Sequence, residues 1–197
     1  MTKRVFDVVV SGIALLLLSP LLLVLGILVR AESPGPAIFR QERVGRYGRP
    51  FRIHKFRTMR EGERAPAFML TVGNDPRVTG LGAFLRRYKL DELPQLIDVF
   101  VGHMSFVGPR PEMSAYVMHY PEEVRNHILS VRPGITDPSS IEFRDESALL
   151  ATAPDPERMY VEEILPKKLA SSRRYLEGRS LLTDIQLIWR TLRNVSS

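Results

Sequence analysis

The chain has no cysteine, so it can form neither a disulfide bond nor a thiolate metal site, and no thiol can act as its nucleophile. Its four histidines are not spaced like zinc ligands; they are His54, His103, His119 and His127. A glycine-rich phosphate loop, an internal repeat and a low-complexity tract are also missing from the sequence. Any chemistry must therefore rely on oxygen nucleophiles and charged side chains.

Basic residues outnumber acidic ones, and the formal net charge of +6 calls for an anionic partner. A basic block covers residues 30–60, in which only Glu32 and Glu42 are acidic, and it directly follows the most hydrophobic stretch of the chain. A polybasic segment beside a membrane element is typical of contact with anionic headgroups. No helix-turn-helix, zinc or aromatic ribonucleoprotein pattern supports a nucleic-acid partner. Membrane lipids are therefore the predicted partner of this block.

The length of 197 residues suits one folded domain with a membrane element. That element is the run of residues 8–29, which contains no charged side chain. As a helix it would be about 33 Å long, enough to cross a hydrocarbon core of about 30 Å. The default interpretation is a single transmembrane helix, because the run is too long for a cleaved signal peptide and has no cleavage site after it.

Two features of this run argue against a simple span. Basic residues flank both ends, with Lys3 and Arg4 before it and the basic block after it, and the positive-inside rule would keep both flanks in the cytoplasm. Ser19 and Pro20 lie near the middle, where the proline ring clashes with the Leu16 carbonyl and bends the helix. The Ser19 hydroxyl can bond a carbonyl freed in this way. Residue physics alone leaves a kinked span and a re-entrant helix open.

Periodicity and breaker residues predict the remaining elements. Two strands at 36–44 and 50–58 flank a turn at 45–48, loops cover 61–79 and 136–146, and helices are expected at 81–88, 93–101, 112–129, 155–176 and 181–192. On one face of the second strand two apolar residues are followed by two cations, in the order Phe51, Ile53, Lys55 and Arg57. This order indicates a strand that leads from the core into a charged pocket, although the two cations would also fit a solvated strand end.

Two adjacent carboxylates, Asp91 and Glu92, precede the helix expected at 93–101. Pro94 is tolerated in a first helical turn, so it places the start of this helix near Glu92. The positive end of the helix dipole would keep both carboxylates ionised and able to hold a metal or attack an electrophile. On their own, acidic residues at this position are more often helix caps.

The string Pro109-Arg110-Pro111 follows a short way downstream. Proline on each side restricts the backbone of Arg110, whose guanidinium fork matches phosphate oxygens. Phosphoryl transfer needs an oxygen nucleophile, a hard cation, and Lys or Arg around the phosphate. Asp91 can supply the nucleophile and share the cation with Glu92, and the candidate phosphate ligands are Lys55, Arg86, Arg110 and Arg144.

These residues lie in blocks that resemble a known signature. LDELPQL at 90–96 and MSFVGPRPE at 104–112, with KFRTM at 55–59 and RPGIT at 132–136, resemble the monotopic phosphoglycosyl transferases of the bacterial sugar transferase family. The order and spacing of the blocks agree along nearly the whole chain.

The resemblance implies a helix-rich α+β fold in which residues 1–30 form a re-entrant membrane helix broken at Ser19 and Pro20. Residues 31–197 would form a cytoplasmic catalytic domain with a small β-hairpin and with amphipathic helices at the membrane interface. The chain would lie on the cytoplasmic face of the bacterial inner membrane, and a homodimer is left open.

The resemblance also implies a reaction. Asp91 would attack the β-phosphorus of a UDP-sugar and release UMP, and polyprenyl (undecaprenyl) phosphate would then take the phosphosugar from Asp91. Glu92 would be its dyad partner, with Mg²⁺ held by Asp91 and Glu92. This transfer would be the first membrane step in making a glycoconjugate such as an exopolysaccharide or a lipopolysaccharide.

The sequence departs from the family pattern at Lys89, Asp98, His103 and residues 137–144, and the last departure leaves the donor sugar open. Two other classes remain as alternatives: a non-catalytic, basic membrane-anchored interaction protein, and a single-pass protein whose soluble domain binds nucleic acid. Neither explains the spacing between Asp91-Glu92 and Pro109-Arg110-Pro111.

Overall fold

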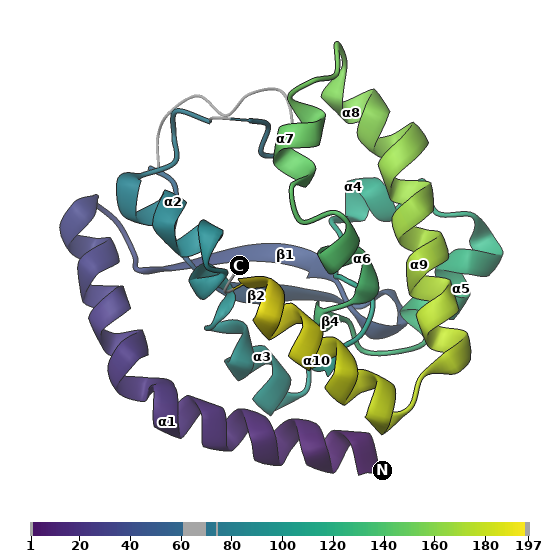
Figure 1. Cartoon of the computed structure of the whole chain (residues 1–197), viewed down its shortest axis with the longest axis horizontal. Coiled ribbons are helices and arrows are strands. Elements are labelled where there is room, and N and C mark those ends of the chain that lie inside the picture. The colour runs from purple at the N-terminus through teal and green to yellow at the C-terminus, as the bar shows by residue number, and fades with distance from the viewer. Residues whose placement is uncertain (1, 61–69, 74, 196–197) are drawn as a thin grey trace.

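The computed structural model describes residues 2–60, 70–73 and 75–195 (Figure 1). The described residues are rich in helix and form two small sheets, so the expected α+β class is confirmed. Most of the loop expected at 61–79 lies outside the described residues. Whether the chain divides functionally at residue 30 stays a prediction.

The first element is helix α1 (Thr2–Glu32), in which Pro20 lies inside one continuous helix. Figure 1 shows this helix changing direction part-way along its length. The Ser19 hydroxyl donates to the Leu16 carbonyl at 2.8 Å, which is the carbonyl that Pro20 cannot bond. The predicted bend and its serine compensation are therefore present within a single helix.

Within the described residues, α1 is the helix that is long and apolar enough to cross a membrane. Its side chains are largely exposed, with Leu16 75% and Leu17 72% accessible. A surface of this kind is costly in water and suits lipid contact. Whether both ends of α1 lie on the same side of the bilayer stays a prediction.

The C-terminal end of α1 is attached to the hairpin formed by β1 (Ile38–Val44) and β2 (Pro50–Phe56). The Arg57 guanidinium donates to the carbonyls of Val29, Ser33 and Pro34. Arg57 is buried there, so it neither joins a charged pocket nor reaches solvent, as the strand pattern had suggested. It satisfies carbonyls at and just beyond the helix end that would otherwise be unpaired.

The hairpin agrees with the sequence prediction. Its strands are antiparallel, from the Ile38–Phe56 pair to the Val44–Pro50 pair, and a 3₁₀ turn, η1 (Arg46–Gly48), joins them. On its inner side Ile53 packs in one cluster with Val99 and Met104.

The next segment carries the predicted helices as α2 (Gly80–Arg87), a 3₁₀ turn η2 (Leu90–Glu92), and α3 (Gln95–Val101). A short strand, β3 (Ser105–Val107), then runs parallel to β4 (Gly134–Thr136). A Cβ atom on Gly134 would overlap the backbone of Gly108, so glycine is required for this close approach. The pairing fixes the base of the loop that carries Arg110.

Two element predictions were wrong. Residues 112–129 form two helices, α4 (Ser114–Val117) and α5 (Glu122–Leu129), because Pro121 interrupts them and begins the second. The loop expected at 136–146 contains α6 (Pro138–Glu142), where the Asp137 carboxylate caps the Ser140 N–H at 2.8 Å. Asp-Pro at a helix start is a recognisable signal that the sequence prediction missed.

The C-terminal helices follow α7 (Glu146–Leu150). They are α8 (Pro156–Met159), a π-helical turn η3 (Tyr160–Ile164), α9 (Leu165–Gly178) and α10 (Leu181–Val195), as predicted. The main core lies between α4, α5, η3 and α9. Part of the apolar stripe of α10 is exposed, including Leu182, Ile185, Trp189 and Leu192.

Candidate active site

The two adjacent carboxylates lie on η2, immediately before α3, and each residue is 8% exposed. Lys89 precedes them in a left-handed conformation (φ 53°), which turns the chain sharply between α2 and η2. Pro94 occupies the N-cap position of α3, which confirms the predicted location of both acids ahead of a helix.

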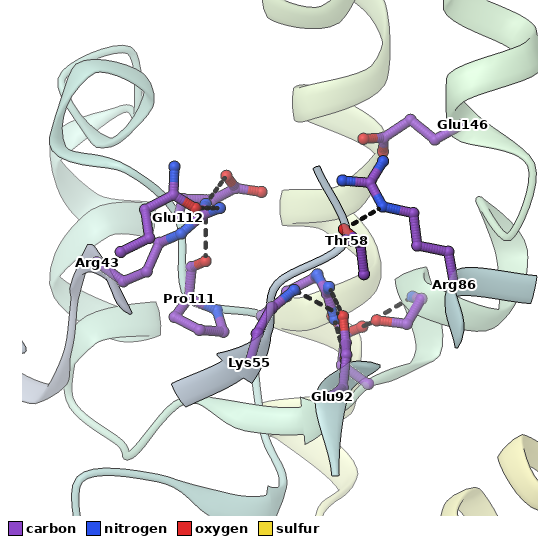
Figure 2. A network of polar contacts seen from close by, with 12 residues as sticks. Arg43, Lys55, Thr58, Arg86, Glu92, Pro111, Glu112 and Glu146 are labelled. Carbon is purple, nitrogen blue, oxygen red and sulfur yellow. Dashed lines mark hydrogen bonds and ion pairs between the residues drawn. The ribbon is translucent and has the colours of Figure 1, made fainter. Parts of the chain in front are cut away.

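Glu92 is bonded to two cations from distant segments. Lys55 on β2 donates to Oε1 at 2.8 Å, and Arg110, in the loop after β3, donates to Oε1 at 2.5 Å and to Oε2 at 3.4 Å. Figure 2 shows Lys55 and Glu92 between the pair Arg43 and Glu112 on one side and the pair Thr58 and Arg86 on the other. Three predicted site residues therefore meet directly.

This arrangement determines the pKa of Glu92. Burial alone would raise it, but the positive charges of Arg110 and Lys55 and the Arg110 hydrogen bonds lower the pKa of Glu92 well below its usual value. In turn, Glu92 raises the pKa of Arg110. Glu92 is therefore an ionised counter-charge that holds two cations.

Asp91 has a different environment. Its Oδ1 atom is buried and has no hydrogen-bond partner in the part of the chain that the structure describes. Burial and the adjacent charge of Glu92 raise the pKa of Asp91, against the opposing effect of Lys55, Lys89 and Arg86. The site thus keeps one carboxylate oxygen available for an incoming group.

An unpartnered carboxylate oxygen is the type of donor that Mg²⁺ prefers, and Mg²⁺ commonly takes one or two carboxylates together with substrate phosphates. The donor set at η2 fits that pattern, with Asp91 as the more available ligand because Glu92 is already bonded to two cations. Among the described residues, no group of three or more histidine or acidic side chains forms a metal cage.

Arg86 faces the same region from α2. Its Nε donates to the Thr58 hydroxyl at 2.8 Å and its Nη1 to the Thr71 hydroxyl at 3.4 Å. The close approach that sets this position involves Gly82, where a Cβ atom would overlap the Thr58 carbonyl. Arg86 bonds neither carboxylate. Burial lowers the pKa of Arg86, and the nearby negative charge of Asp91 opposes that shift, so the two side chains are close enough to interact.

Arg144 does not join this group. It is exposed on the turn between α6 and α7, and it makes no hydrogen bond or ion pair within the described ranges. Arg144 lies at the end of residues 137–144, the segment in which the sequence departs from the family pattern. The structure therefore assembles Lys55, Arg86, Asp91, Glu92 and Arg110, but it does not place Arg144 against them.

A buried network behind the Arg110 loop was not predicted. The Tyr160 hydroxyl on η3 donates to Glu112 Oε1 at 2.6 Å. Arg43 Nη1 lies 3.6 Å from Glu112 Oε2 and donates to the Pro111 carbonyl at 3.4 Å. Lys168 Nζ on α9 lies 3.8 Å from Glu112 Oε1. The network contacts the Arg110 loop at the Pro111 carbonyl and at Glu112. The only local signal was an acid directly after Pro111, and nothing nearby in sequence indicates its partners.

Comparison with known proteins identifies the family of this chain. A family model described as bacterial sugar transferase matches residues 1–197. The chain belongs to the bacterial sugar transferase family. Among its relatives in this family is the UDP-glucose:undecaprenyl-phosphate glucose-1-phosphate transferase of Escherichia coli K12, which is 38% identical over 193 residues. That alignment covers 96% of the present chain and 39% of the relative.

Two further relatives show the range of activities for which these proteins are named. The Caulobacter vibrioides transferase named for the same reaction is 36% identical, with 96% of this chain and 68% of the relative aligned. The UDP-N-acetylgalactosamine-undecaprenyl-phosphate N-acetylgalactosaminephosphotransferase of Aeromonas hydrophila is 34% identical, with 98% of this chain and 43% of the relative aligned. The chain thus spans about two fifths of the length of the E. coli and Aeromonas relatives.

Proposed function

We propose that this chain transfers a sugar 1-phosphate from a UDP-sugar to a polyprenyl phosphate such as undecaprenyl phosphate. The relatives named for this reaction support the substrate classes. The observation that carries the proposal is the buried, unpartnered Oδ1 of Asp91 beside a Glu92 that is held by Lys55 and Arg110.

The proposed reaction has two displacements at one phosphorus. Asp91 Oδ1 attacks the β-phosphorus of the UDP-sugar, the bond from that phosphorus to the bridging oxygen breaks, and UMP leaves. An oxygen of the polyprenyl phosphate then attacks the phosphosugar on Asp91, and cleavage of the acyl phosphate restores the carboxylate. The acceptor phosphate is already largely ionised near pH 7, so a general base is not needed.

Charge makes this attack feasible. Lys55, Arg86 and Arg110 contribute three positive charges and Asp91 and Glu92 two negative ones, which leaves a net charge of +1 for an anionic substrate. Because Glu92 fixes Lys55 and Arg110, their remaining N–H groups are oriented before the substrate arrives. With its lowered pKa, Glu92 acts in this scheme by positioning cations and not by accepting a proton.

Magnesium belongs to the same proposal. Asp91, with Glu92 beside it, would hold the ion, which would supply charge neutralisation for the diphosphate.

The membrane surface fits a reaction between one soluble and one lipid substrate. Exposed apolar side chains on α1, on α3 (Ile97, Phe100 and Val101) and on α10 support contact with a membrane surface. The proposed side is the cytoplasmic face of the inner membrane, because basic residues flank the apolar run of α1.

The test is a burst experiment with the purified full chain, magnesium and a panel of UDP-sugars. Without acceptor, we expect up to one equivalent of UMP per chain and a mass increase of one phosphosugar on the peptide that contains Asp91. Adding undecaprenyl phosphate should then give turnover, and Asp91→Asn should abolish both phases while leaving the circular dichroism spectrum unchanged. UMP release by Asp91→Asn at a rate near that of the unmodified chain would exclude the covalent mechanism, and no transfer with any UDP-sugar would favour the interaction-protein alternative.

A further inference from the structure

A second polar site lies at the start of α1. It is an open cavity of about 210 Å³ lined by Lys3, Arg4, Arg46, Arg132, Tyr175 and Arg179, with Asp7 and Ser105, and is called the basic pocket below. None of the five residues assembled around Glu92 lines it. Its cations come from α1, η1, the segment before β4 and the segment after α9, which only the folded chain brings together.

The three inner arginines of the basic pocket are held by backbone carbonyls. Arg4 donates to the carbonyls of Val99 at 2.6 Å and Phe100 at 2.8 Å, Arg46 to that of Ser130 at 2.8 Å, and Arg132 to that of Gly102 at 2.7 Å. Within residues 2–60, 70–73 and 75–195, none of the three forms an ion pair with a carboxylate. Carbonyls fix the guanidinium groups in place without neutralising their charge.

The remaining charges do not compensate for this excess. Lys3 is paired with Asp184 on α10, so it contributes little net charge. Arg179 is exposed at the rim. Among the described residues that line the pocket, Asp7 is the one carboxylate. Burial, together with the nearby charges of Arg4 and Arg46, lowers the pKa of Arg132, in keeping with a position close to two other cations.

Such a group of cations matches a phosphate. Each arginine uses one or two N–H groups on a carbonyl and keeps others free, and a guanidinium fork matches two phosphate oxygens. The Arg46 guanidinium is further restrained by stacking on Tyr47, since its Cζ atom lies 4.4 Å from the centre of that ring. A bound phosphate would supply the negative charge that Arg4, Arg46 and Arg132 lack.

The position of the pocket indicates where that phosphate comes from. Arg4 contacts the end of α3, where Phe100 and Val101 expose their side chains, and Lys3 contacts α10, where Leu182 and Ile185 do so. Figure 1 shows the N-terminal end of α1 beside these two helices. A cationic cavity bordered by exposed apolar side chains is suited to a lipid whose chains lie in the bilayer and whose headgroup lies above it.

We propose that the basic pocket binds the phosphate headgroup of an anionic membrane phospholipid, separately from the transfer site, and so fixes the N-terminal end of α1 at the membrane surface. The proposal does not depend on the transfer reaction.

The test uses native mass spectrometry of the full chain in detergent, titrated with short-chain phosphatidylglycerol, with phosphatidylcholine of the same chain length, and with inorganic phosphate. We expect one preferred phosphatidylglycerol adduct, weakened on the order of tenfold or more in Arg46→Gln/Arg132→Gln. Arg49→Gln/Arg52→Gln is the matched control, since it removes two exposed charges of the same basic block outside the pocket. It should leave the adduct unchanged.

Arg179→Gln provides a second variant for the case in which the double variant fails to fold, because Arg179 is exposed at the rim. It should weaken phosphatidylglycerol binding severalfold at an unchanged Tm. Equal weakening in the control pair, or no preference for phosphatidylglycerol over phosphatidylcholine, would overturn the proposal. Competition by inorganic phosphate at the same concentration as the lipid would assign the pocket to a free anion and contradict the lipid assignment.

Discussion

Asp91 and Glu92 are neighbours in sequence and equally buried, yet the fold gives them opposite properties. Lys55 and Arg110 bond Glu92 and lower its pKa, whereas Asp91 Oδ1 is left without a partner and the pKa of Asp91 is raised. An acidic pair that looks symmetrical in sequence is thus divided into a counter-charge and an available oxygen.

Glu92→Gln should destabilise the chain as well as impair transfer. Removing the carboxylate leaves Lys55 and Arg110 close together without their counter-charge, and breaking a buried pair of this kind costs roughly 3–5 kcal/mol. We expect a clear drop in Tm in detergent. Glu92→Gln/Lys55→Met, which removes one of the two stranded cations, should recover part of that loss, and a Tm for Glu92→Gln equal to that of the unmodified chain would contradict the anchoring role.

At the scale of elements, short contacts between segments set the position of the site. α2 can approach the end of β2 only because Gly82 has no side chain, and this approach places Arg86 against Thr58. The C-terminal end of α1 is held by the hydrogen bonds that Arg57 donates to backbone carbonyls there. The helix bends within its apolar run at Ser19 and Pro20.

Gly82→Ala should lower both stability and activity. The added methyl group would overlap the Thr58 carbonyl, so α2 must move away from β2 and carry Arg86 with it, and overpacking of this kind costs about 1–3 kcal/mol. We expect Tm to fall by several degrees and the KM for the UDP-sugar to rise. Gly178→Ala is the matched control because a methyl group there meets no atom within 4 Å, and it should change neither quantity.

The bend in α1 gives a topology prediction. Both ends of the helix should lie on the cytoplasmic side, since basic residues flank its apolar run and Pro20 lets the chain turn back. The chain has no native thiol, so Thr2→Cys and Met118→Cys can be tested with a membrane-impermeant reagent in intact cells. Neither should be labelled, and replacing Ser19 and Pro20 with Leu and Ala should expose position 2 in a fraction of molecules. Labelling of position 2 with Ser19 and Pro20 intact would establish a single-pass span.

At the scale of the whole molecule, charge and apolar surface are arranged as the proposed reaction between a soluble and a lipid substrate would need. Lys55, Arg86 and Arg110 surround the two acids, while α1 and parts of α3 and α10 expose apolar side chains. A nucleotide sugar would reach the site from water and a lipid phosphate from the bilayer.

The proposed role of a divalent cation gives a prediction for transfer by the full chain. Because carboxylate oxygens are the available donors, we expect excess chelator to abolish transfer and Mg²⁺ to restore it better than softer ions do. Release of UMP measured across a magnesium titration checks this, with calcium and zinc at matched concentrations for comparison. Full activity in excess chelator would remove the metal from the proposal.

The sequence by itself determined the parts whose causes are local. The apolar run and its Ser19-Pro20 bend, the hairpin with its turn at residues 46–48, and the helix that follows Asp91 and Glu92 all depend on neighbouring residues. Local reasoning failed where a breaker or cap was overlooked, at Pro121 and at Asp137. The helix pattern at 181–192 identified α10, but it could not tell which apolar side chains are exposed.

Only the tertiary structure decided which charges meet. Lys55 and Glu92 are 37 residues apart, and Arg110 reaches Glu92 only because the β3–β4 pairing fixes the base of its loop. Arg57, two residues beyond Lys55, was assigned by pattern to the same pocket, yet it caps α1, while Arg144 stays exposed. Side-chain periodicity predicts the face of an element on which a residue lies, but it does not predict which distant residue it contacts. The network around Glu112 and the basic pocket therefore depend on the tertiary structure, which brings distant segments together.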